Sequence, residues 1–329
     1  MVLTARRQVL VSIIVVAGLF IGALFALASQ SGSSVRGWLV GHVVLPVLGI
    51  GRHDGPDDLK RRIRENRAAG PALPPQKLRD RFEFSDETTP SGRVLVLKPH
   101  DGAKICILYL HGGAYVSDLI APHWDVIGGL ADRTHAEIRA LLYPLAPEHH
   151  WPDGIAAAQL AYDAMVSRFG ADKVIVAGDS AGGGLALLLA QSLASTDRPM
   201  PAGLVLFSPW LDVSMSGADQ PEIAKRDPML KIDGLRMAAT LWADGLPLND
   251  PRISPLFGDQ THLPPTLLFV GTDDILLSDA HRLMSTGAKV TLREYPGMFH
   301  VWVGAPIPEA KRALDEAAAF IDTQTHRSR

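Results

Sequence analysis

The feature that constrains this chain most is a regular alternation, from about Phe82 onward, of short apolar runs and longer helix-forming stretches. The runs are rich in Val, Ile and Leu, which is typical of strands buried on both faces of a parallel sheet. They lie at residues 105–110, 137–142, 173–177, 203–207, 266–270 and 290–295. Helical stretches lie between them, at residues 154–169, 182–195, 279–285 and 308–323. This alternation predicts an α/β fold with a mostly parallel central sheet flanked by helices.

Two segments modify the pattern. Residues 93–98 alternate apolar and polar side chains, as an outer strand would. Residues 211–264 interrupt the rhythm with a long insert, which includes an amphipathic piece near residues 232–241. Inserts of this size in α/β enzymes usually build a lid over the site. We therefore expect a catalytic domain over residues 76–329 that carries a lid insert at about 211–264.

Composition excludes several other classes of protein. Hydrophobic residues make up 47% of the chain and charged residues 20%, which fits a globular protein and not a disordered one. The net charge of −3 gives no basic surface for nucleic acid. The single cysteine, Cys106, cannot form an intrachain disulfide and excludes a zinc site built from cysteines.

The N-terminal segment differs from everything after it. Arg6 and Arg7 precede residues 9–28, which carry no charge and at about 1.5 Å rise per residue would span roughly one bilayer core. We expect residues 1–35 to form a transmembrane anchor, with a signal peptide cleaved after Ala28 as the alternative. Both alternatives predict a catalytic part outside the cytoplasm, either membrane-anchored or exported.

Residues 36–75 are expected to form N-terminal lid helices and a linker. The apolar run at residues 38–50 is too short to span a membrane and is broken by Pro46. We interpret it as a lid helix, with a position on the membrane surface as the alternative. Residues 57–69 are charged and predict a solvated helix face, and residues 70–75 indicate a linker into the main domain.

The candidate chemistry begins at GDSAGG, residues 178–183. A G-x-S-x-G match is weak alone, but here a predicted strand ends at the motif and an apolar helix follows at once. In such a strand–turn–helix the Ser180 hydroxyl is exposed, and the flanking glycines let neighbouring chain approach closely. A phosphate-binding loop is the alternative, but the chain has no G-x-x-x-x-G-K-[ST] motif. We therefore expect Ser180 to be a nucleophile.

The sequence HGGAY, residues 111–115, directly follows the first apolar run. Acyl transfer needs N–H donors aimed at the place where the carbonyl oxygen becomes negative. Consecutive glycines let successive amides point in the same direction. We expect the N–H groups of Gly112 and Gly113, together with that of Ala181, to form an oxyanion hole, and His111 to orient this loop.

A nucleophilic serine needs a base, and the base needs an acid that orients it. Among the twelve histidines, His300 lies on a loop between the apolar run at residues 290–295 and the last helical stretch. Asp273 and Asp274 follow the run at residues 266–270 and are the candidate acids. The order Ser, Asp, His along the chain is the order expected of α/β-hydrolases.

Seven motifs in this chain resemble those of the hormone-sensitive lipase family of α/β-hydrolases, also called the bacterial family IV esterases. The resemblance covers about residues 93–321. The motifs are HGGAY (111–115), YPLAPE (143–148), GDSAGG (178–183), SPWLD (208–212), DPRISPL (250–256), TDDILLSD (272–279) and YPGMFH (295–300). The chain departs from the family pattern at Ala114, which replaces a third glycine, and at Pro144, which removes a usual arginine and the salt bridge it would make.

The resemblance implies an α/β-hydrolase fold with a helical lid built from the N-terminal region and the insert. It also implies a serine carboxylic-ester hydrolase, a carboxylesterase or lipase-like enzyme that acts on short-to-medium acyl esters. In this pattern Ser180 is the nucleophile, His300 the base and Asp274 the acid, with Asp273 as the fallback. The alternatives are an amidase or lactonase with the same triad, and a non-catalytic ligand-binding protein. The expected partner is a small ester substrate, with no cofactor and no metal.

Overall fold

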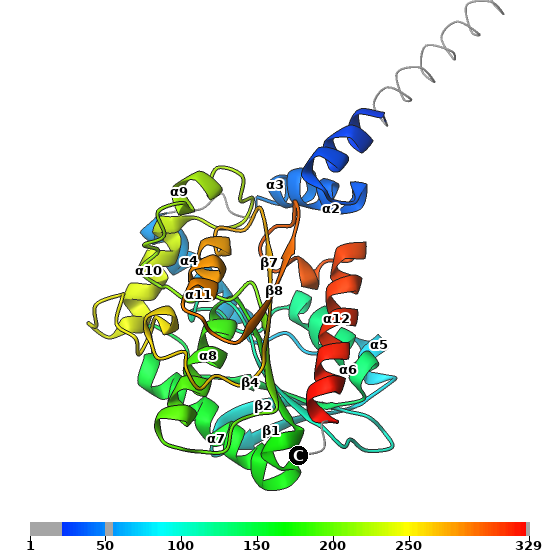
Figure 1. The fold of residues 1–329 in the computed structure, drawn as a ribbon, viewed down its shortest axis with the longest axis vertical. Helices are drawn as coiled ribbons and strands as arrows, with labels where there is room; N and C mark the ends of the chain where they lie inside the picture. The colour runs from blue at the N-terminus through cyan, green and yellow to red at the C-terminus, as the bar shows by residue number, and fades with distance from the viewer. Residues whose placement is uncertain (1–21, 50–54, 327–329) are drawn as a thin grey trace, which may run out of the picture.

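The computed structural model describes residues 22–49 and 55–326, and an eight-stranded sheet forms its centre (Figure 1). The strands are β1 (Glu83–Thr89), β2 (Gly92–Lys98), β3 (Cys106–Leu110), β4 (Glu137–Leu142), β5 (Val174–Asp179), β6 (Gly203–Phe207), β7 (Thr266–Gly271) and β8 (Val290–Tyr295). Their order in the sheet is β1-β2-β4-β3-β5-β6-β7-β8. The pairs β1–β2 and β2–β4 are antiparallel, and all other pairs are parallel. The predicted mostly parallel sheet is confirmed.

The antiparallel edge of the sheet differs from the prediction. The alternation at residues 93–98 predicts an outer strand, but β2 lies second from the edge and its residues 94–97 are all buried. The outermost strand, β1, has the polar sequence EFSDETT and pairs with one neighbour only. A strand at the edge of a sheet can stay polar because solvent covers part of its surface, so no apolar run predicts it.

Helices cover both faces of the sheet (Figure 1). On one face lie α6 (Ala121–Thr134) and α12 (Pro308–Thr325), which also contact each other. On the other face lie α7 (Trp151–Phe169), α8 (Ser180–Ser195) and α11 (Leu277–Ser285). The structure is therefore a three-layer α/β arrangement of helices, sheet and helices.

Each central strand contributes side chains to two apolar cores. In β3, Cys106, Leu108 and Leu110 belong to the core between the sheet and helices α7 and α8. Ile107 and Tyr109 belong to the core beneath α6 and α12. Because successive side chains of a strand point to opposite faces, a strand covered on both faces needs an unbroken apolar run. This is the pattern that the sequence shows.

The insert after β6 contains α9 (Gln220–Ile223), α10 (Ile232–Ala243) and the 3₁₀ helix η3 (Pro255–Phe257). Helix α10 confirms the amphipathic piece predicted near residues 232–241 and contacts α4 (Pro56–Ala69). Helix α4 is not only a solvated face, because it buries two apolar side chains in the core, those of Leu59 and Ile63. The remaining short helices are α2 (Val35–Leu39), η1 (Val40–Val44), α3 (Leu45–Val47), α5 (Gln76–Arg79), η2 (Ala171–Lys173) and η4 (Trp302–Gly304).

The predicted membrane segment requires a correction. Across residues 22–49 and 55–326, none of the helices combines the length and the apolar character needed to cross a membrane. Residues 9–21, the larger part of the stretch at 9–28 that was interpreted as an anchor, lie outside the described residues. Residues 22–28 of that stretch are helical, and this helix ends at Ser31, before Gly32 with its φ of 72°. The transmembrane and membrane assignments are therefore not supported.

Candidate active site

The nucleophile candidate lies at the junction of β5 and α8. Ser180 has a φ of 51°, in the left-handed region that residues other than glycine seldom adopt. A β-carbon on Gly178 would lie 2.5 Å from the carbonyl oxygen of Gly182. One on Gly182 would lie 1.9 Å from the carbonyl oxygen of Leu110 in β3. Both glycines of the motif are therefore required by backbone that passes too close for a side chain.

Two glycine-to-alanine substitutions at the same helical position should have opposite effects on stability. Gly182→Ala in the first turn of α8 should lower the free energy of unfolding by ~2 kcal/mol or more, because its β-carbon meets fixed backbone. Gly234→Ala in the first turn of α10 meets no atom within 4 Å. It should raise the free energy of unfolding by up to about 1 kcal/mol, because alanine favours the helix. Urea denaturation of both variants measures the difference, and equal effects would contradict this account of the turn.

The structure brings three predicted residues into one hydrogen-bonded chain. The Oγ of Ser180 lies 2.9 Å from Nε2 of His300, and Nδ1 of His300 lies 3.0 Å from Oδ2 of Asp274. The other oxygen of Asp274 accepts the N–H of Leu276 at 2.9 Å. All three side chains are buried, Asp274 completely. This arrangement orients the imidazole toward the hydroxyl as proton abstraction requires.

The fallback acid, Asp273, points elsewhere. Its Oδ1 accepts a hydrogen bond from Nε of Arg226 at 3.1 Å. Its backbone N–H donates to the carbonyl of Met298 at 3.0 Å, so the backbone of Asp273 holds the loop before His300. Of the two adjacent carboxylates, only that of Asp274 bonds to the imidazole.

Ser208, a residue for which the sequence predicts no role, holds the backbone next to His300. Val301 has a φ of 49°, which is unusual for a β-branched residue. Its N–H donates to Oγ of Ser208 at 3.2 Å, and the N–H of Ser208 donates to the carbonyl of Phe269 at 2.7 Å. Ser208 is the first residue of the SPWLD motif, which is the signal that could have identified it.

The charges around His300 act in opposite directions on its pKa. Burial lowers the pKa of His300, because the apolar interior disfavours the imidazolium. The Asp274 carboxylate raises it by charge and by hydrogen bonding, and Asp227 and Asp179 add to this effect. The net direction is upward from the ordinary value.

The pH dependence of catalysis should follow from this direction. If neutral His300 is the base, kcat/KM should rise with pH as the imidazole loses its proton, and then level off. Because the pKa of His300 is raised, the midpoint should lie at or above the roughly 6.5 of an unperturbed histidine. Initial rates of ester hydrolysis across roughly pH 5 to 9 measure this, and a flat profile would argue against an imidazole base.

One predicted oxyanion donor is already engaged. The N–H of Gly112 donates to Oδ1 of Asp179 at 3.1 Å, and the hydroxyl of Tyr109 donates to the same oxygen at 2.6 Å. Burial raises the pKa of Asp179, but the neighbouring His123 and the Tyr109 hydroxyl outweigh burial and hold this pKa below its ordinary value. Asp179 is thus an ionised acceptor that fixes the position of the Gly112 backbone by a hydrogen bond. The sequence predicts the Gly112 N–H as an oxyanion donor, and in this structure that N–H already has an acceptor.

Three other N–H groups near Ser180 remain available. Within the described part of the chain, no acceptor receives the N–H of Gly113, Ala114 or Ala181. Gly113, Ala114 and Tyr115 have φ values of 124°, 54° and 63°, so the loop turns through successive left-handed residues. The two predicted donors Gly113 and Ala181 are accompanied by Ala114, the residue that replaces the third glycine of the family pattern.

His111 is the first residue of the loop at residues 111–115, in which the oxyanion donors are predicted. Its ring stacks on that of Tyr143 with 4.5 Å between centroids, and the Tyr143 hydroxyl donates to the carbonyl of His111 at 2.7 Å. Its Nδ1 lies 2.7 Å from the carbonyl oxygen of Gly112. Burial lowers the pKa of His111 to about 4, so its ring is neutral near pH 7. These contacts support the predicted role of His111 in orienting the loop.

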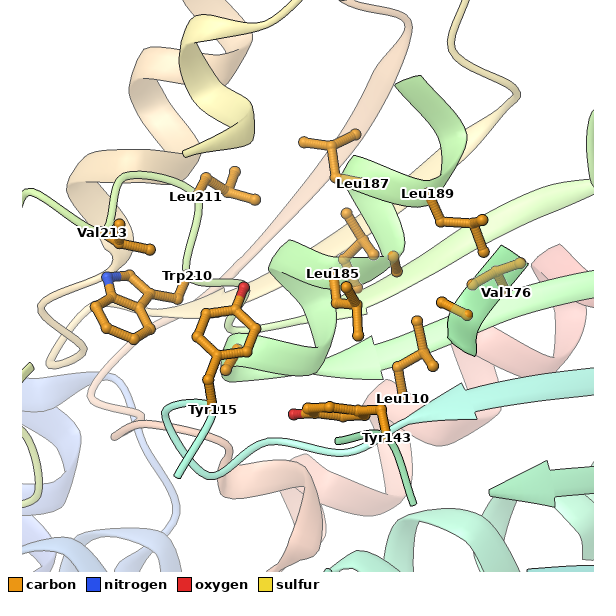
Figure 2. Close-up of a cluster of buried hydrophobic side chains, with 14 of the residues drawn as sticks. Leu110, Tyr115, Tyr143, Val176, Leu185, Leu187, Leu189, Trp210, Leu211 and Val213 are labelled. Atoms are coloured by element: carbon orange, nitrogen blue, oxygen red, sulfur yellow. The ribbon is translucent and has the colours of Figure 1, made fainter. Parts of the chain in front are cut away.

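An aromatic cluster joins the insert to the loop at residues 111–115. Tyr115 stacks on Trp242 of α10, with 4.4 Å between centroids and 4° between the ring planes. It also stacks on Trp210 at 5.8 Å, and the two rings lie beside the first turns of α8 (Figure 2). The backbone N–H of Trp210 donates to the backbone carbonyl of Ser180 at 2.9 Å. Large, fully buried aromatic side chains therefore pack beside the start of α8, next to Ser180.

The N-terminal segment packs against the loop that carries His300. The backbone N–H and the hydroxyl of Ser34 donate to the carboxylate of Glu309 at 2.7 and 3.0 Å. A β-carbon on Gly41 would lie 3.1 Å from Cδ1 of Phe299, the residue before His300. This contact places the backbone around Gly41 directly beside the His300 loop.

Helix α4 supplies an arginine near the place where the family pattern loses one. Arg67 pairs with Glu148 at 3.0 Å and donates to the carbonyls of Val116 and Ala146, each at 3.0 Å. Glu148 is the last residue of the YPLAPE motif, in which Pro144 replaces the usual arginine. Arg67 therefore provides an ion pair in this region despite the substitution.

The available groups are a hydroxyl, an imidazole, a carboxylate and free N–H donors, which together are the groups that acyl transfer uses. Within residues 22–49 and 55–326, no cluster of three or more His, Cys, Asp or Glu side chains is arranged to hold a metal ion. A carbonyl carbon placed next to the Ser180 hydroxyl could be attacked while His300 takes the proton.

Comparisons with known proteins agree with this geometry. A sequence family described as having the alpha/beta hydrolase fold matches residues 107–304. An acetyl-hydrolase from Streptomyces hygroscopicus is 37% identical over 226 residues, covering 67% of this chain and 76% of the relative. An esterase from Acinetobacter venetianus is 36% identical, covering 68% and 77%. The crystal structure of a hormone-sensitive lipase from a metagenome library superposes with a TM-score of 0.70 at 30% identity, covering 82% of this chain and 98% of that one.

The family match extends from β3 to the loop after His300 and so includes every strand of the parallel part of the sheet. The similar proteins are named for ester hydrolysis, and one of the solved structures is named for the family that the sequence motifs resemble. The chain therefore belongs to the hormone-sensitive lipase family of α/β-hydrolases and is a carboxylesterase or lipase-like hydrolase.

Proposed function

We propose that this enzyme hydrolyses carboxylic esters with Ser180 as nucleophile, His300 as general base and Asp274 as the acid that orients the imidazole. The observation that carries the proposal is the continuous hydrogen-bonded chain from the Ser180 hydroxyl through His300 to Asp274. Both links lie within ordinary hydrogen-bond distance, and the imidazole is buried.

The proposed reaction has two halves. Ser180 attacks the ester carbonyl while His300 accepts its proton, and the Asp274 carboxylate stabilises the imidazolium that forms. His300 then protonates the departing alcohol and leaves an acyl group on Ser180. In the second half, His300 activates a water that releases the acid and restores the free serine.

The negative oxygen of the tetrahedral intermediate needs N–H donors. We assign this role to Gly113, Ala114 and Ala181, whose N–H groups have no acceptor within the described residues. Ala181 lies in the first turn of α8, where the free N–H groups and the helix dipole both favour negative charge. The backbone of Gly112 contributes indirectly through its bond to Asp179.

The preferred substrates are proposed to be esters of short-to-medium acyl chains. The aromatic cluster of Tyr115, Trp210 and Trp242 supports this, because its buried rings fill the region beside the first turns of α8. The name of the similar acetyl-hydrolase also supports a short acyl group. The insert and residues 36–49 would act as a lid, since they contact the oxyanion loop and the His300 loop respectively.

A panel of p-nitrophenyl esters from acetate to palmitate tests this preference. We expect kcat/KM to be highest for acetate through hexanoate and about tenfold or more lower for palmitate, because a bounded acyl site discriminates by chain length. Ser180→Ala protein provides the blank for spontaneous hydrolysis of these activated esters. A maximum at palmitate would contradict the proposed acyl preference while leaving the triad intact.

A further inference from the structure

A buried carboxylate close to the triad has no part in the reaction described above. Asp227 belongs to the insert, between α9 and α10, and only 3% of its surface is exposed. Its Oδ1 accepts the N–H groups of Met229 and Leu230 at 2.8 and 2.9 Å, which closes a turn within the insert. Its Oδ2 accepts the N–H of Ile275 at 2.8 Å. One carboxylate thus ties the insert to a distant loop.

That loop is the one that carries the proposed acid. Ile275 directly follows Asp274, whose Oδ1 accepts the next amide, that of Leu276, at 2.9 Å. Two successive amides are therefore held by two carboxylates, one from the loop itself and one from the insert. The second oxygen of Asp274 is left to bond His300. Any displacement of the Ile275 amide would move the Asp274 side chain relative to the imidazole.

Arg226, the residue before Asp227, forms hydrogen bonds to the outer side of the same loop. Arg226 donates from Nε and Nη2 to the carbonyl of Thr272 at 3.0 and 2.9 Å. Its Nε also bonds Oδ1 of Asp273 at 3.1 Å. The adjacent side chains of Arg226 and Asp227 therefore hold the loop that carries Asp274, the first at its beginning and the second at its buried end.

We propose that Arg226 and Asp227 together hold the loop at residues 272–276, an arrangement that we call the clasp. In this proposal Asp227 is a positioning residue for the triad, because it fixes the position of Asp274 and adds a negative charge near His300. The inference rests on the proposed function, because it assigns a role relative to Ser180, His300 and Asp274. It goes beyond that function by making the insert part of the machinery that aligns the acid as well as a cover over the site.

The charge of Asp227 should affect the pKa of His300, which a purely structural contact would leave unchanged. The charged groups that act on Asp227 are Asp274 and His300. Nearby, Arg226 is paired with Asp273, and Asp179 acts on His300 from the side of Ser180. Burial and the neighbouring Asp274 charge raise the pKa of Asp227 above its ordinary value. Once ionised, Asp227 raises the pKa of His300. Removing this carboxylate should therefore lower the pKa of His300.

The test is the pH dependence of kcat/KM for Asp227→Asn, with p-nitrophenyl butyrate as substrate. We expect the midpoint of the acid limb to fall by roughly 0.5 to 1 pH unit, because a nearby negative charge has been removed. We also expect kcat above the midpoint to fall by about tenfold, because the acid is less well placed. Asp250→Asn is the matched control, since Asp250 lies in the same insert and its carboxylate bonds the amide and guanidinium of Arg252 instead. The control should keep the wild-type midpoint.

A lower plateau with an unchanged midpoint in Asp227→Asn would overturn the proposal, because it would indicate a structural contact only. Should Asp227→Asn fail to fold, Arg226→Met tests the outer half of the clasp, since 45% of the Arg226 side chain is exposed and its replacement should be tolerated. That variant should lose several-fold in kcat with KM unchanged, and an unchanged kcat would overturn the clasp. A wild-type profile with no acid limb would instead reject the triad itself, which separates the two failures.

Discussion

Replacing Ser180 with alanine should lower kcat by about 10⁴-fold or more, because the Ser180 hydroxyl is the group that His300 is proposed to activate. Folding should be retained, since alanine removes only the hydroxyl and its hydrogen bond to His300. Steady-state hydrolysis of p-nitrophenyl butyrate measures the loss. Ser195→Ala is the matched control, because Ser195 ends the same helix and bonds only the carbonyl of Ser192.

The control variant should keep its activity within about twofold, as surface substitutions away from a site usually do. Near wild-type turnover by Ser180→Ala would show that another residue is the nucleophile. Circular dichroism of both variants separates loss of chemistry from loss of fold.

Replacing Asp274 with asparagine should lower kcat by roughly 10³- to 10⁴-fold, because the amide favours the wrong tautomer of His300. Asp273→Asn is the natural comparison, because it makes the same chemical change one residue earlier. Asp273 bonds Arg226 and not His300, so its substitution should be much milder. Measuring kcat for the pair decides the assignment.

If the ranking were reversed, with Asp273→Asn the more damaged, Asp274 would not be the acid. The imidazole would then have to rotate away from the position that the structure gives it. Equal and small losses in both variants would argue that no carboxylate orients the base.

Buried strands were the most predictable part of this fold. The run at residues 203–207 coincides with β6, which is buried at every position, because a strand covered on both faces must be apolar throughout. The runs at residues 137–142 and 290–295 coincide with β4 and β8, although β8 lies at an edge of the sheet and exposes several of its side chains. Strand β1 could not be predicted in this way. Its polar side chains lie at an edge, and only its antiparallel pairing with β2 makes it a strand.

Helix α6 also has no clear sequence signal. Its centre contains Gly128 and Gly129, which lower helix propensity. The structure shows why glycine is needed: a β-carbon on Gly128 would lie 2.6 Å from a methyl group of Leu78. One on Gly129 would lie 2.6 Å from a methyl group of Leu314. Close packing of α6 against its neighbours, which the local sequence cannot show, stabilises this helix.

The motifs and their order along the chain were enough to predict which residues form the hydrogen-bonded chain at the candidate site. Ser180, His300 and Asp274 are hydrogen-bonded as the motifs predict, although their catalytic roles remain predictions. The engaged N–H of Gly112 could not be foreseen, because it depends on where the Asp179 side chain lies in three dimensions. Asp227 was missed for a related reason. A single aspartate in an irregular insert has no periodicity, and its bond to Ile275 exists only in the folded chain.

The central claim is that Ser180 is a nucleophile activated by His300, and covalent labelling tests it most directly. A fluorophosphonate should form one adduct per wild-type chain, and peptide mass spectrometry should locate that adduct on Ser180. The Ser180→Ala protein should remain unlabelled under the same conditions, while Ser195→Ala should label like wild type. An adduct on any other residue, or labelling of Ser180→Ala at the wild-type rate, would contradict the account.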